Sequence, residues 1–551
     1  MPKSTGARVQ ASARVQTPTR VARALWVLIA VTVAAFALLR VPYLSVPLER
    51  DEGEYAYIAQ RIIEGDVPYR DAFDQKPPGV FLAYAAAFLV FGQSIESIHL
   101  LLYLWTAATA LVLFFLVRRL SGDWEAGFAG LIFAVASVDP RLVATAANTE
   151  IFMLLPITAS MFCLVRGLAE PRARWWLACG ALAAAACWFK QVAALNAVFV
   201  AVYAGAALFR REGAGASLRV LLWMVLGVAL TSLPILLWFA FAGAWTSFVD
   251  AVFLHNLAYA QSRPLLDGLE TALYWMRRQT PSQAVFWALA ALALLVPRWA
   301  EWRTRRLLGF WFLASAAGVA VGFRFRPHYF IQWLPALAAL GGVAAGGVVQ
   351  RLWDRSRGAG VIGTVSLAGL LIVPPVVANW EILRAEPDSI SRQIYTLNPF
   401  PESLEIADYI RRTSDADDTI YVVGSEPQIF FYARRRSATR YIFFYPLTGA
   451  YSDASERQAE VIREVKANRP RYVVVVNLRT SLMATPGTDT YVFEETVKIL
   501  ASGYRLEFVV RPHGGDPGFD FLYGSEARRA ELEVVQQNRS RPGLAVYRRR
   551  K

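Results

Sequence analysis

Long apolar runs alternate with short polar or basic segments over the first two thirds of the chain. The runs lie near residues 24–40, 79–91, 98–117, 126–144, 151–165, 175–189, 192–209, 220–242, 284–297, 307–323, 330–349 and 361–378. A helix needs roughly 20 residues to cross a bilayer, and about 17 at the short end. The 79–91 run is shorter than this and directly follows two prolines. Whether it crosses decides the side on which every later loop lies.

The positions of the arginines answer that question. If 79–91 does not cross, one side of the membrane carries the N-terminal arm together with most basic loops: Arg118, Arg119, Arg166, Arg172, Arg174, Arg210, Arg211, Arg219, Arg298, Arg303, Arg305, Arg306, Arg351, Arg355 and Arg357. Cytoplasmic loops are enriched in Lys and Arg. We therefore predict eleven spans, a cytoplasmic N-terminus and an extracytoplasmic C-terminal domain. The 79–91 run then lies along the outer membrane face or re-enters it, within a first outer loop that covers 41–97.

Composition agrees with a multi-pass membrane protein, which we expect in the plasma (inner) membrane. Hydrophobic residues make up 56% of the 551, and the mean hydropathy is +0.35, against about 45–50% apolar residues in soluble proteins. The net charge is +14, but acids and bases nearly balance after Glu381. The excess base lies in the membrane part, which favours contact with lipid over nucleic-acid binding. The three cysteines lie inside apolar runs and indicate no disulfide or metal framework.

The pattern predicts three regions. Residues 1–23 are a cytoplasmic arm, 24–379 a helical membrane domain, and 380–551 a soluble α/β domain. Basic residues precede the first span, and Arg40 to Tyr43 offer no small-residue cleavage site, so we interpret it as uncleaved. In the last region, helical patterns at 403–412, 456–467 and 490–502 alternate with strand patterns at 419–423, 441–445, 471–477 and 505–511. This alternation is typical of a partly parallel sheet.

The stretch from Arg50 to Gly79 is unusually polar for a loop beside a membrane. It begins with Asp51 and Glu52 and ends with Lys76, Pro77, Pro78 and Gly79. A carboxylate at the membrane surface can take a proton from an incoming hydroxyl, as a general base. Acids also favour a helix N-terminus, which is the purely structural alternative. Lys76 is a compact positive charge suited to a lipid phosphate, and simple snorkelling is its alternative.

The remaining unusual polar residues fall on the same predicted side. They come from four further loops: Glu150, which follows Asn148 and Thr149; Lys190; His255 with Asn256; and Arg324, Arg326, His328 and Tyr329. Ionisable groups inside apolar runs are functional candidates, and two arginines with a histidine and a tyrosine suit phosphate contact. Each residue also has a purely structural alternative. Lys190 can snorkel to the membrane surface, His255 can be an ordinary interfacial histidine, and Tyr329 can belong to the aromatic belt. Five loops that converge on one face indicate a site.

Together these residues resemble the type-C glycosyltransferases. The group most like this chain is the protein O-mannosyltransferase and aminoarabinose lipid A transferase family (family 39), and the resemblance covers roughly residues 20 to 350. It implies an integral membrane, inverting transferase whose donor is a sugar on a polyprenyl phosphate. Asp51 matches the family's catalytic base, with Glu52 beside it. Lys76 and Tyr329 match donor-phosphate ligands, to which Lys190, Arg324 and Arg326 are added as candidates. Glu150 and Lys190 match cavity residues of the family, and we expect Glu150, His255 and His328 on the cavity or acceptor side.

The chain departs from that family at two positions. Glu54 occupies a place where the aminoarabinose enzymes carry a phosphate-binding arginine, so we expect phosphate contact to fall on Lys76, Arg324 or Arg326. Gln75 replaces a glutamate near the family's possible metal site at His255, which argues against zinc. There is no Walker loop, so ATP is not an expected energy source. No cofactor is required that the sequence shows, and a divalent metal is left open.

Two other functions fit the same outline. One is a transporter or flippase of lipid-linked sugars, although paired halves with broken helices are not evident. The other is a non-catalytic scaffold, which leaves the acidic pair and Lys76 unexplained. The sugar is not indicated, nor is the acceptor, which is a protein, a lipid or a glycan.

Overall fold

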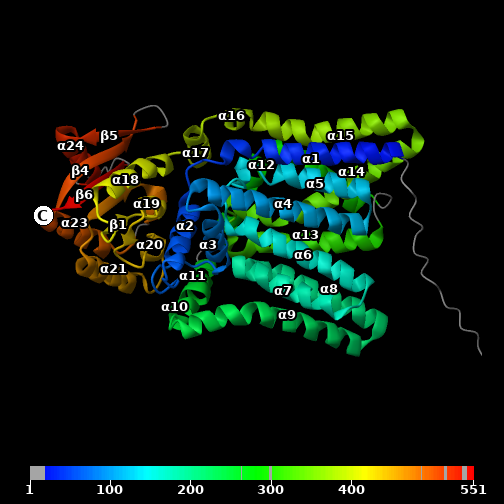
Figure 1. Ribbon diagram of the computed structural model, residues 1–551, viewed down its shortest axis with the longest axis horizontal. Coiled ribbons are helices and arrows are strands. Elements are labelled where there is room, and N and C mark those ends of the chain that lie inside the picture. The colour runs from blue at the N-terminus through cyan, green and yellow to red at the C-terminus, as the bar shows by residue number, and fades with distance from the viewer. Residues whose placement is uncertain are drawn as a thin grey trace, which may run out of the picture.

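The computed structural model describes residues 19–261, 264–296, 301–484, 487–513, 518–535 and 543–550. A long helical bundle carries a smaller α/β domain on one end (Figure 1). We call this end of the bundle the capped end. The first 18 residues of the predicted arm 1–23 lie outside the described residues.

In the part of the chain that the structure describes, eleven long helices form the bundle, and each overlaps one of the eleven predicted spans. They are α1 (Thr19–Leu38), α4 (Ile95–Leu120), α5 (Asp123–Ala136), α6 (Thr149–Ala169), α7 (Ala173–Phe189), α8 (Ala194–Glu212), α9 (Ala214–Phe241), α12 (Leu265–Leu295), α13 (Trp302–Ala320), α14 (Leu334–Arg355) and α15 (Arg357–Ala378). Within the described ranges, eight segments are long and apolar enough to cross a membrane. The other three, α5, α7 and α12, are too short or too polar over part of their length, so the count of eleven stays a prediction.

α14 lies at the centre of the bundle. It packs against α5, α12 and α15, and most of its residues are buried. Small residues allow this close packing: a Cβ on Gly342 would lie 2.5 Å from the Cβ of Ala129, and one on Gly346 would lie 2.3 Å from the backbone nitrogen of Glu125. Small residues at helix interfaces are the usual solution in membranes, where backbones must approach closely.

Short elements gather at the capped end. They are η1 (Val41–Tyr43), α2 (Arg50–Ile63), α3 (Gly79–Phe91), η2 (Pro140–Leu142), η3 (Gln191–Ala193), α10 (Trp245–Val249), η4 (Asp250–Leu254), α11 (His255–Gln261), η6 (Val321–Phe323) and η7 (Pro327–Trp333). Figure 1 shows α2 and α3 running across the ends of the bundle helices, between the bundle and the α/β domain. The 79–91 run is thus a helix of 13 residues that lies across the bundle.

The α/β domain follows two connecting helices, α16 (Trp380–Leu383) and α17 (Pro387–Tyr395). Its helices are α18 (Phe400–Thr413), α19 (Gln428–Ala433), α20 (Tyr445–Thr448), α21 (Ala454–Asn468), α22 (Arg479–Leu482), α23 (Tyr491–Gly503) and α24 (Gly524–Val535). Its strands are β1 (Thr419–Val423), β2 (Arg436–Ser437), β3 (Tyr472–Asn477), β4 (Tyr504–Pro512), β5 (Phe519–Tyr523) and β6 (Gly543–Arg549), in the order β2-β1-β3-β6-β4-β5.

The sheet is mixed, as the alternating pattern predicts. β1 runs parallel to β2 and β3, whereas β6 is antiparallel to both β3 and β4. The predicted strand at 441–445 is wrong. Tyr441 and Phe443 are buried there without pairing, because their rings pack on Phe73 of the first loop at 5.3 and 6.4 Å between centroids. The apolar pattern at 441–445 reflects burial against the membrane domain and not against a neighbouring strand.

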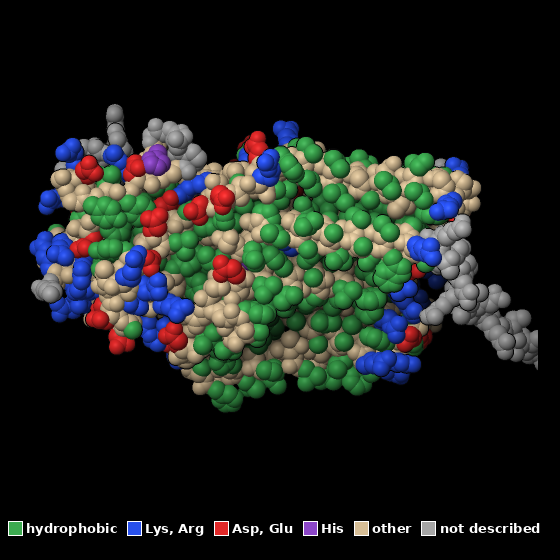
Figure 2. Space-filling model, turned by 45° about the horizontal axis from the view of Figure 1, so that its top comes forward, with side chains coloured by type: hydrophobic (Ala, Val, Ile, Leu, Met, Phe, Trp, Pro, Cys, Tyr) green, Lys and Arg blue, Asp and Glu red, His purple; other side chains and the backbone are tan. Residues whose placement is uncertain are grey.

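The surface repeats this division. Figure 2 shows hydrophobic side chains over most of the visible bundle, with Lys and Arg side chains gathered at the end away from the α/β domain. The α/β domain itself shows mixed acidic and basic side chains. A broad apolar band bounded by charges is what a bilayer requires of the protein that spans it.

Candidate active site at the capped end

The start of α2 fixes Asp51. Glu49 and Glu52 form a capping box, in which each side chain accepts a hydrogen bond from the other's backbone NH. This arrangement satisfies backbone donors that a helix start leaves open. Asp51 follows in the first turn, and its side chain is 27% exposed. The acid nearest to open space at this position is therefore Asp51, whereas Glu52 points into the protein.

Lys76 lies opposite Asp51, at the end of the first loop. Its Nζ is 3.8 Å from Oδ1 of Asp51, 3.1 Å from Oε2 of Glu54 and 3.4 Å from Oδ1 of Asp74. The lysine backbone is held as well, because its NH donates to Asp74 and its carbonyl accepts from the hydroxyl of Tyr69. One ammonium group thus lies among three carboxylates.

The charges of this group depend on burial and on each other. Burial raises the pKa of Asp51, but Lys76, with further cations, outweighs it and holds that pKa below its usual value. Burial and the neighbouring carboxylate of Asp74 raise the pKa of Glu54 well above the usual range, and burial also raises the pKa of Asp74. The pKa of Lys76 is raised by the carboxylates around it, although burial acts in the opposite direction. Asp51 is therefore the most readily ionised of the three carboxyl groups.

Glu52 is committed to holding the structure together. It is 2% exposed, and its Oε1 accepts from the backbone NH of Ala147 at 2.7 Å and lies 3.2 Å from Nε2 of His99. Its Oε2 accepts from the NH of Glu49 at 3.1 Å. Both carboxylate oxygens are thus bonded, to the start of α2, to α4 and to the loop before α6. Neither oxygen is left to contact a substrate beside Asp51.

A second polar cluster lies across from Asp51. Glu150, in the first turn of α6, forms an ion pair with Lys190 and lies 3.6 Å from Nε2 of His328. The Nζ of Lys190 lies 4.3 Å from the ring centroid of Tyr329. The charges of Glu150, Lys190 and His328 act on the pKa of Asp51, so the two clusters lie close together. The structure thereby brings together residues from four of the five predicted loops.

Arg324 and Arg326 occupy different surroundings. Arg324 donates to the carbonyl of Tyr259 at 3.2 Å and lies over that ring at 3.6 Å. The hydroxyl of Tyr259 is in turn 3.4 Å from that of Tyr329. Arg326 is exposed at the start of η7, two residues before His328. Arg324 therefore contacts the tyrosine pair, while Arg326 is exposed to solvent.

The fifth predicted loop, with His255 and Asn256, packs beside the loop that carries Lys76. His255 is 5% exposed and lies between Phe73 and Tyr451, with ring centroids 5.5 and 4.3 Å away. Burial, with Arg457 nearby, lowers its pKa to about 3, so the imidazole is neutral. Asn256 donates to the carbonyl of Gln75, which ties this loop to Lys76. Among the described residues no three His, Cys, Asp or Glu side chains are arranged to hold a metal ion.

The α/β domain completes the surroundings, which sequence reasoning missed. Arg50, the residue before Asp51, donates to the carbonyl of Ser425 and pairs with Glu426 at 2.7 Å. The ring of Phe443 lies 5.9 Å from Nζ of Lys76. Asp74 and Glu54, the partners of Lys76, were also absent from the predicted set. The signal for Asp74 was its place two residues before Lys76; the contacts of Arg50 have no local signal.

Comparisons with known proteins agree with the resemblance to glycosyltransferases seen in the sequence. Residues 75–238 match the family described as dolichyl-phosphate-mannose-protein mannosyltransferase, and residues 401–485 match the Ccs4 C-terminal domain family of competence-induced proteins. The chain also superposes on ArnT from Cupriavidus metallidurans in the apo state, with a TM-score of 0.56 and 17% identity over 95% of this chain and 98% of that one. The chain has the type-C glycosyltransferase fold.

Two further structures share this fold. ArnT from Cupriavidus metallidurans bound to undecaprenyl phosphate gives a TM-score of 0.54 and 16% identity, over 96% of this chain and 98% of that one. The archaeal oligosaccharyltransferase AglB from Archaeoglobus fulgidus, in complex with an inhibitory peptide and a dolichol-phosphate, gives 0.50 and 12%, over 91% and 74%. A search of curated protein sequences finds no match. The resemblance to type-C glycosyltransferases predicted for residues 20 to 350 is confirmed at the level of the fold, and the superposition extends beyond these residues, over 95% of the chain.

Proposed function

We propose that this protein is a glycosyltransferase that moves a sugar, a hexose or a pentose, from a polyprenyl-phosphate donor to an acceptor hydroxyl. The observation that carries the proposal is the pair of Asp51 and Lys76. An ionised carboxylate open to solvent lies 3.8 Å from a lysine ammonium, at the end of an apolar bundle. The match of residues 75–238 to a mannosyltransferase family supports the same reaction class.

The proposed step uses these residues directly. The acceptor oxygen attacks the anomeric carbon of the donor sugar while Asp51 removes the hydroxyl proton. The bond between the anomeric carbon and the phosphate oxygen breaks, and its electron pair leaves with the polyprenyl phosphate. Attack opposite the leaving group inverts the anomeric configuration. Cations stabilise the charge that develops on the phosphate, and no metal or other cofactor is required for the step.

We place the donor phosphate between the two clusters. Lys76 supplies one cation, and Lys190 and Arg326 supply others beside Tyr329, with Arg324 bracing that tyrosine through Tyr259. Glu150 and His328 hold Lys190 and line the cavity toward the acceptor. Glu54 competes with phosphate for Lys76, because it already lies 3.1 Å from Nζ. Phosphate binding therefore depends more on the Lys190 side than in a site with arginine at position 54.

We assign Glu52 and His255 to supporting positions. Glu52 fixes the start of α2 through both of its oxygens, so it positions Asp51 and does not exchange protons with substrate. His255 is neutral and packed between aromatic rings, which supports the loop before Lys76. A divalent metal remains outside the proposal, since the described residues offer no ligand set for one.

The proposed orientation places the site outside the cytoplasm. With the N-terminus cytoplasmic and eleven spans, the capped end and the α/β domain lie on the extracytoplasmic face of the plasma membrane. ArnT has been seen with undecaprenyl phosphate, and AglB with a peptide and a dolichol-phosphate. By analogy, the acceptor here is a glycan, a lipid or a protein that approaches beneath the α/β domain.

A direct test is donor consumption. Purified full-length protein is incubated with radiolabelled polyprenyl-phosphate sugars and a cell-envelope extract, and released polyprenyl phosphate is measured. We expect release with at least one donor, dependent on Asp51. Movement of labelled donor across vesicles without release would instead indicate a flippase, and neither release nor movement would favour a scaffold.

A further inference from the structure

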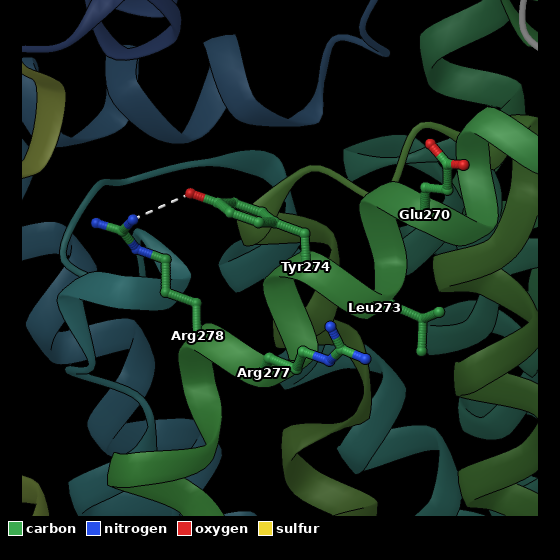
Figure 3. A pocket seen from close by; sticks show the side chains of 5 residues that line it. All are labelled: Glu270, Leu273, Tyr274, Arg277 and Arg278. Atoms are coloured by element: carbon green, nitrogen blue, oxygen red, sulfur yellow. Dashed lines mark hydrogen bonds between the residues drawn. The ribbon is translucent and has the colours of Figure 1, made fainter.

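The first half of α12 carries a hollow of about 540 Å³ that shares no residue with the site. Its walls are Glu270, Leu273, Tyr274, Arg277 and Arg278. Figure 3 shows these five side chains along one helical segment, with Arg278 directed at the hydroxyl of Tyr274. Neither the sequence patterns nor the proposed transfer reaction accounts for this group.

This half of the helix does not run through the bundle. Near its start, Gly268 touches Phe323 of η6, so closely that a Cβ on the glycine would lie 2.6 Å from that residue. Further on, Ser282 and Gln283 donate to Asp139, which directly precedes η2. Both η6 and η2 lie at the capped end, and η2 contacts η7. Gly268 and Ser282 are roughly 20 Å apart along the helix at 1.5 Å per residue, so this half lies across the capped end.

The helix then turns into the bundle. Pro281 lies inside α12, and proline removes a backbone hydrogen bond and bends a helix at this kind of position. Beyond it, Phe286 and Leu289 pack near Gly341 of the central helix α14. α12 is therefore an interfacial segment joined to a shorter inserted one, which explains why it lacks the composition of a full span.

The interfacial half has three distinct faces. Gly268, Ala272 and Gln279 are buried against the protein. Beside them, at 100° per residue, lies an exposed aliphatic stripe, whose members are Leu265, Leu266, Leu269, Leu273 and Met276, exposed by 51, 73, 46, 55 and 44%. Arg277 borders the stripe, and Arg278 lies beyond it, where it donates to the hydroxyl of Tyr274 at 3.1 Å. Glu270 bonds neither arginine (Figure 3).

We propose that residues 265–278 lie in the lipid headgroup layer and that Arg277 and Arg278 bind the phosphate of an anionic phospholipid. An exposed aliphatic stripe beside a basic pair is the composition of an interfacial helix. Guanidinium groups bind phosphate oxygens in pairs, and a nearby aromatic hydroxyl adds a donor. The aliphatic stripe contacts the acyl chains of the same lipid. This binding does not depend on the transfer reaction.

Spin labels test where the helix lies. Leu273→Cys and Glu270→Cys are labelled separately in full-length protein whose three native cysteines are replaced, in nanodiscs of phosphatidylcholine with phosphatidylglycerol. We expect the label at 273 to be reached by oxygen more than by a water-soluble nickel complex, and the label at 270 to show the reverse. A label at 273 that is reached mainly by the nickel complex overturns the proposal.

Lipid retention tests the arginine pair. Full-length protein is released from micelles that hold equal amounts of phosphatidylglycerol and phosphatidylcholine, and bound lipids are counted by native mass spectrometry. We expect the double variant R277Q/R278Q to lose phosphatidylglycerol about tenfold, from the attraction of each basic residue to anionic lipid, with phosphatidylcholine unchanged. The control Glu270→Gln, on the same helix, keeps or increases it. Equal retention by wild type and R277Q/R278Q would refute the assignment.

Discussion

The guanidinium of Arg50 lies 2.7 Å from a carboxylate oxygen of Glu426, although 376 residues separate the two in sequence. Glu426 follows β1 at the carboxyl end of the parallel strands, and Ser481 beyond β3 donates to it as well. Glu426 is fully buried. Through Glu426, at the end of its sheet, the α/β domain therefore holds Arg50, the residue next to Asp51.

Loss of the ion pair between Arg50 and Glu426 should slow the reaction more than it weakens donor binding. Loss of one partner leaves a buried charge that costs roughly 3–5 kcal/mol, so we consider the double variant R50M/E426Q. We expect kcat to fall by about 10- to 100-fold with little change in KM, because misplacement of a reacting group acts on the chemical step. The single variant Arg50→Lys should recover part of the rate.

A matched control exists at the same domain boundary. Arg436 pairs with Asp66 at 3.3 Å, and its side chain is 53% exposed. Arg436→Gln should leave kcat near the wild-type value, since exposed pairs contribute only about 0–1 kcal/mol. Wild-type kcat in R50M/E426Q would mean that Asp51 is positioned by α2 alone.

Asp51→Asn should abolish transfer and preserve folding. The amide is isosteric but cannot accept the acceptor's proton, and loss of a general base costs about 10²- to 10⁴-fold in rate. Release of polyprenyl phosphate in a single turnover, compared with thermal unfolding in detergent, separates the two effects. Near-normal turnover in this variant would remove Asp51 from its role.

Glu52→Gln should behave in the opposite way. The carboxylate accepts from the backbone NH of Ala147 and of Glu49 and contacts His99, and an amide group can replace only part of this. We expect a loss of about 1–3 kcal/mol in stability, seen as a lower midpoint of thermal unfolding. At temperatures where the variant is folded, kcat should fall far less than in Asp51→Asn; an equal fall would place Glu52 in the chemistry.

Glu54→Gln should strengthen phosphate binding. The substitution removes a negative charge 3.1 Å from Nζ of Lys76 and leaves that ammonium free to pair with phosphate. We expect sugar-free polyprenyl phosphate to bind up to about tenfold more tightly in a competition assay, because an exchange of one close charge is worth on the order of 1 kcal/mol or more. Glu64→Gln, at the end of the same helix, should change nothing. Weaker binding in Glu54→Gln would show that Glu54 orders Lys76 and does not compete for it.

The rate should persist to low pH. Since Lys76 and its neighbours hold the pKa of Asp51 below its usual value despite burial, the base stays ionised as the pH falls. We expect kcat/KM to show no acid limb due to Asp51 above about pH 4, near the ordinary aspartate pKa. Lys190→Met removes one of these cations and also exposes Asp51 to the uncompensated charge of Glu150. The acid limb should then move to higher pH, and an unmoved limb would contradict the electrostatic account.

The sequence predicted which residues gather at the site, but it did not predict which of them contact one another. Apolar periodicity and arginine placement were sufficient to bring Asp51, Lys76, Glu150, Lys190 and Tyr329 to one end of the bundle. The same reasoning could not separate Asp51 from Glu52, because adjacent residues on a helix differ only in the direction that packing gives them. The pairing of Arg50 with Glu426 depends on how two domains dock, which no local pattern records.

A similar limit explains the errors in secondary structure. The segment at 441–445 is apolar because it covers Phe73 of the membrane domain, and burial against another domain produces the same pattern as burial within a sheet. The predicted 284–297 run covers only the second half of α12, because the first half lies across the end of the bundle, held there through Gly268 and Asp139, and lacks an apolar run.

The position of β6 has a consequence for the order of assembly. Residues 543–549 lie in the middle of the sheet, between β3 and β4. During synthesis, β1 and β3 emerge long before the strand that joins them to β4 and β5. The domain therefore closes only after the ribosome has made residue 549, when every bundle helix has already been inserted. The sheet from which Glu426 reaches Arg50 is therefore complete only once β6 has been made.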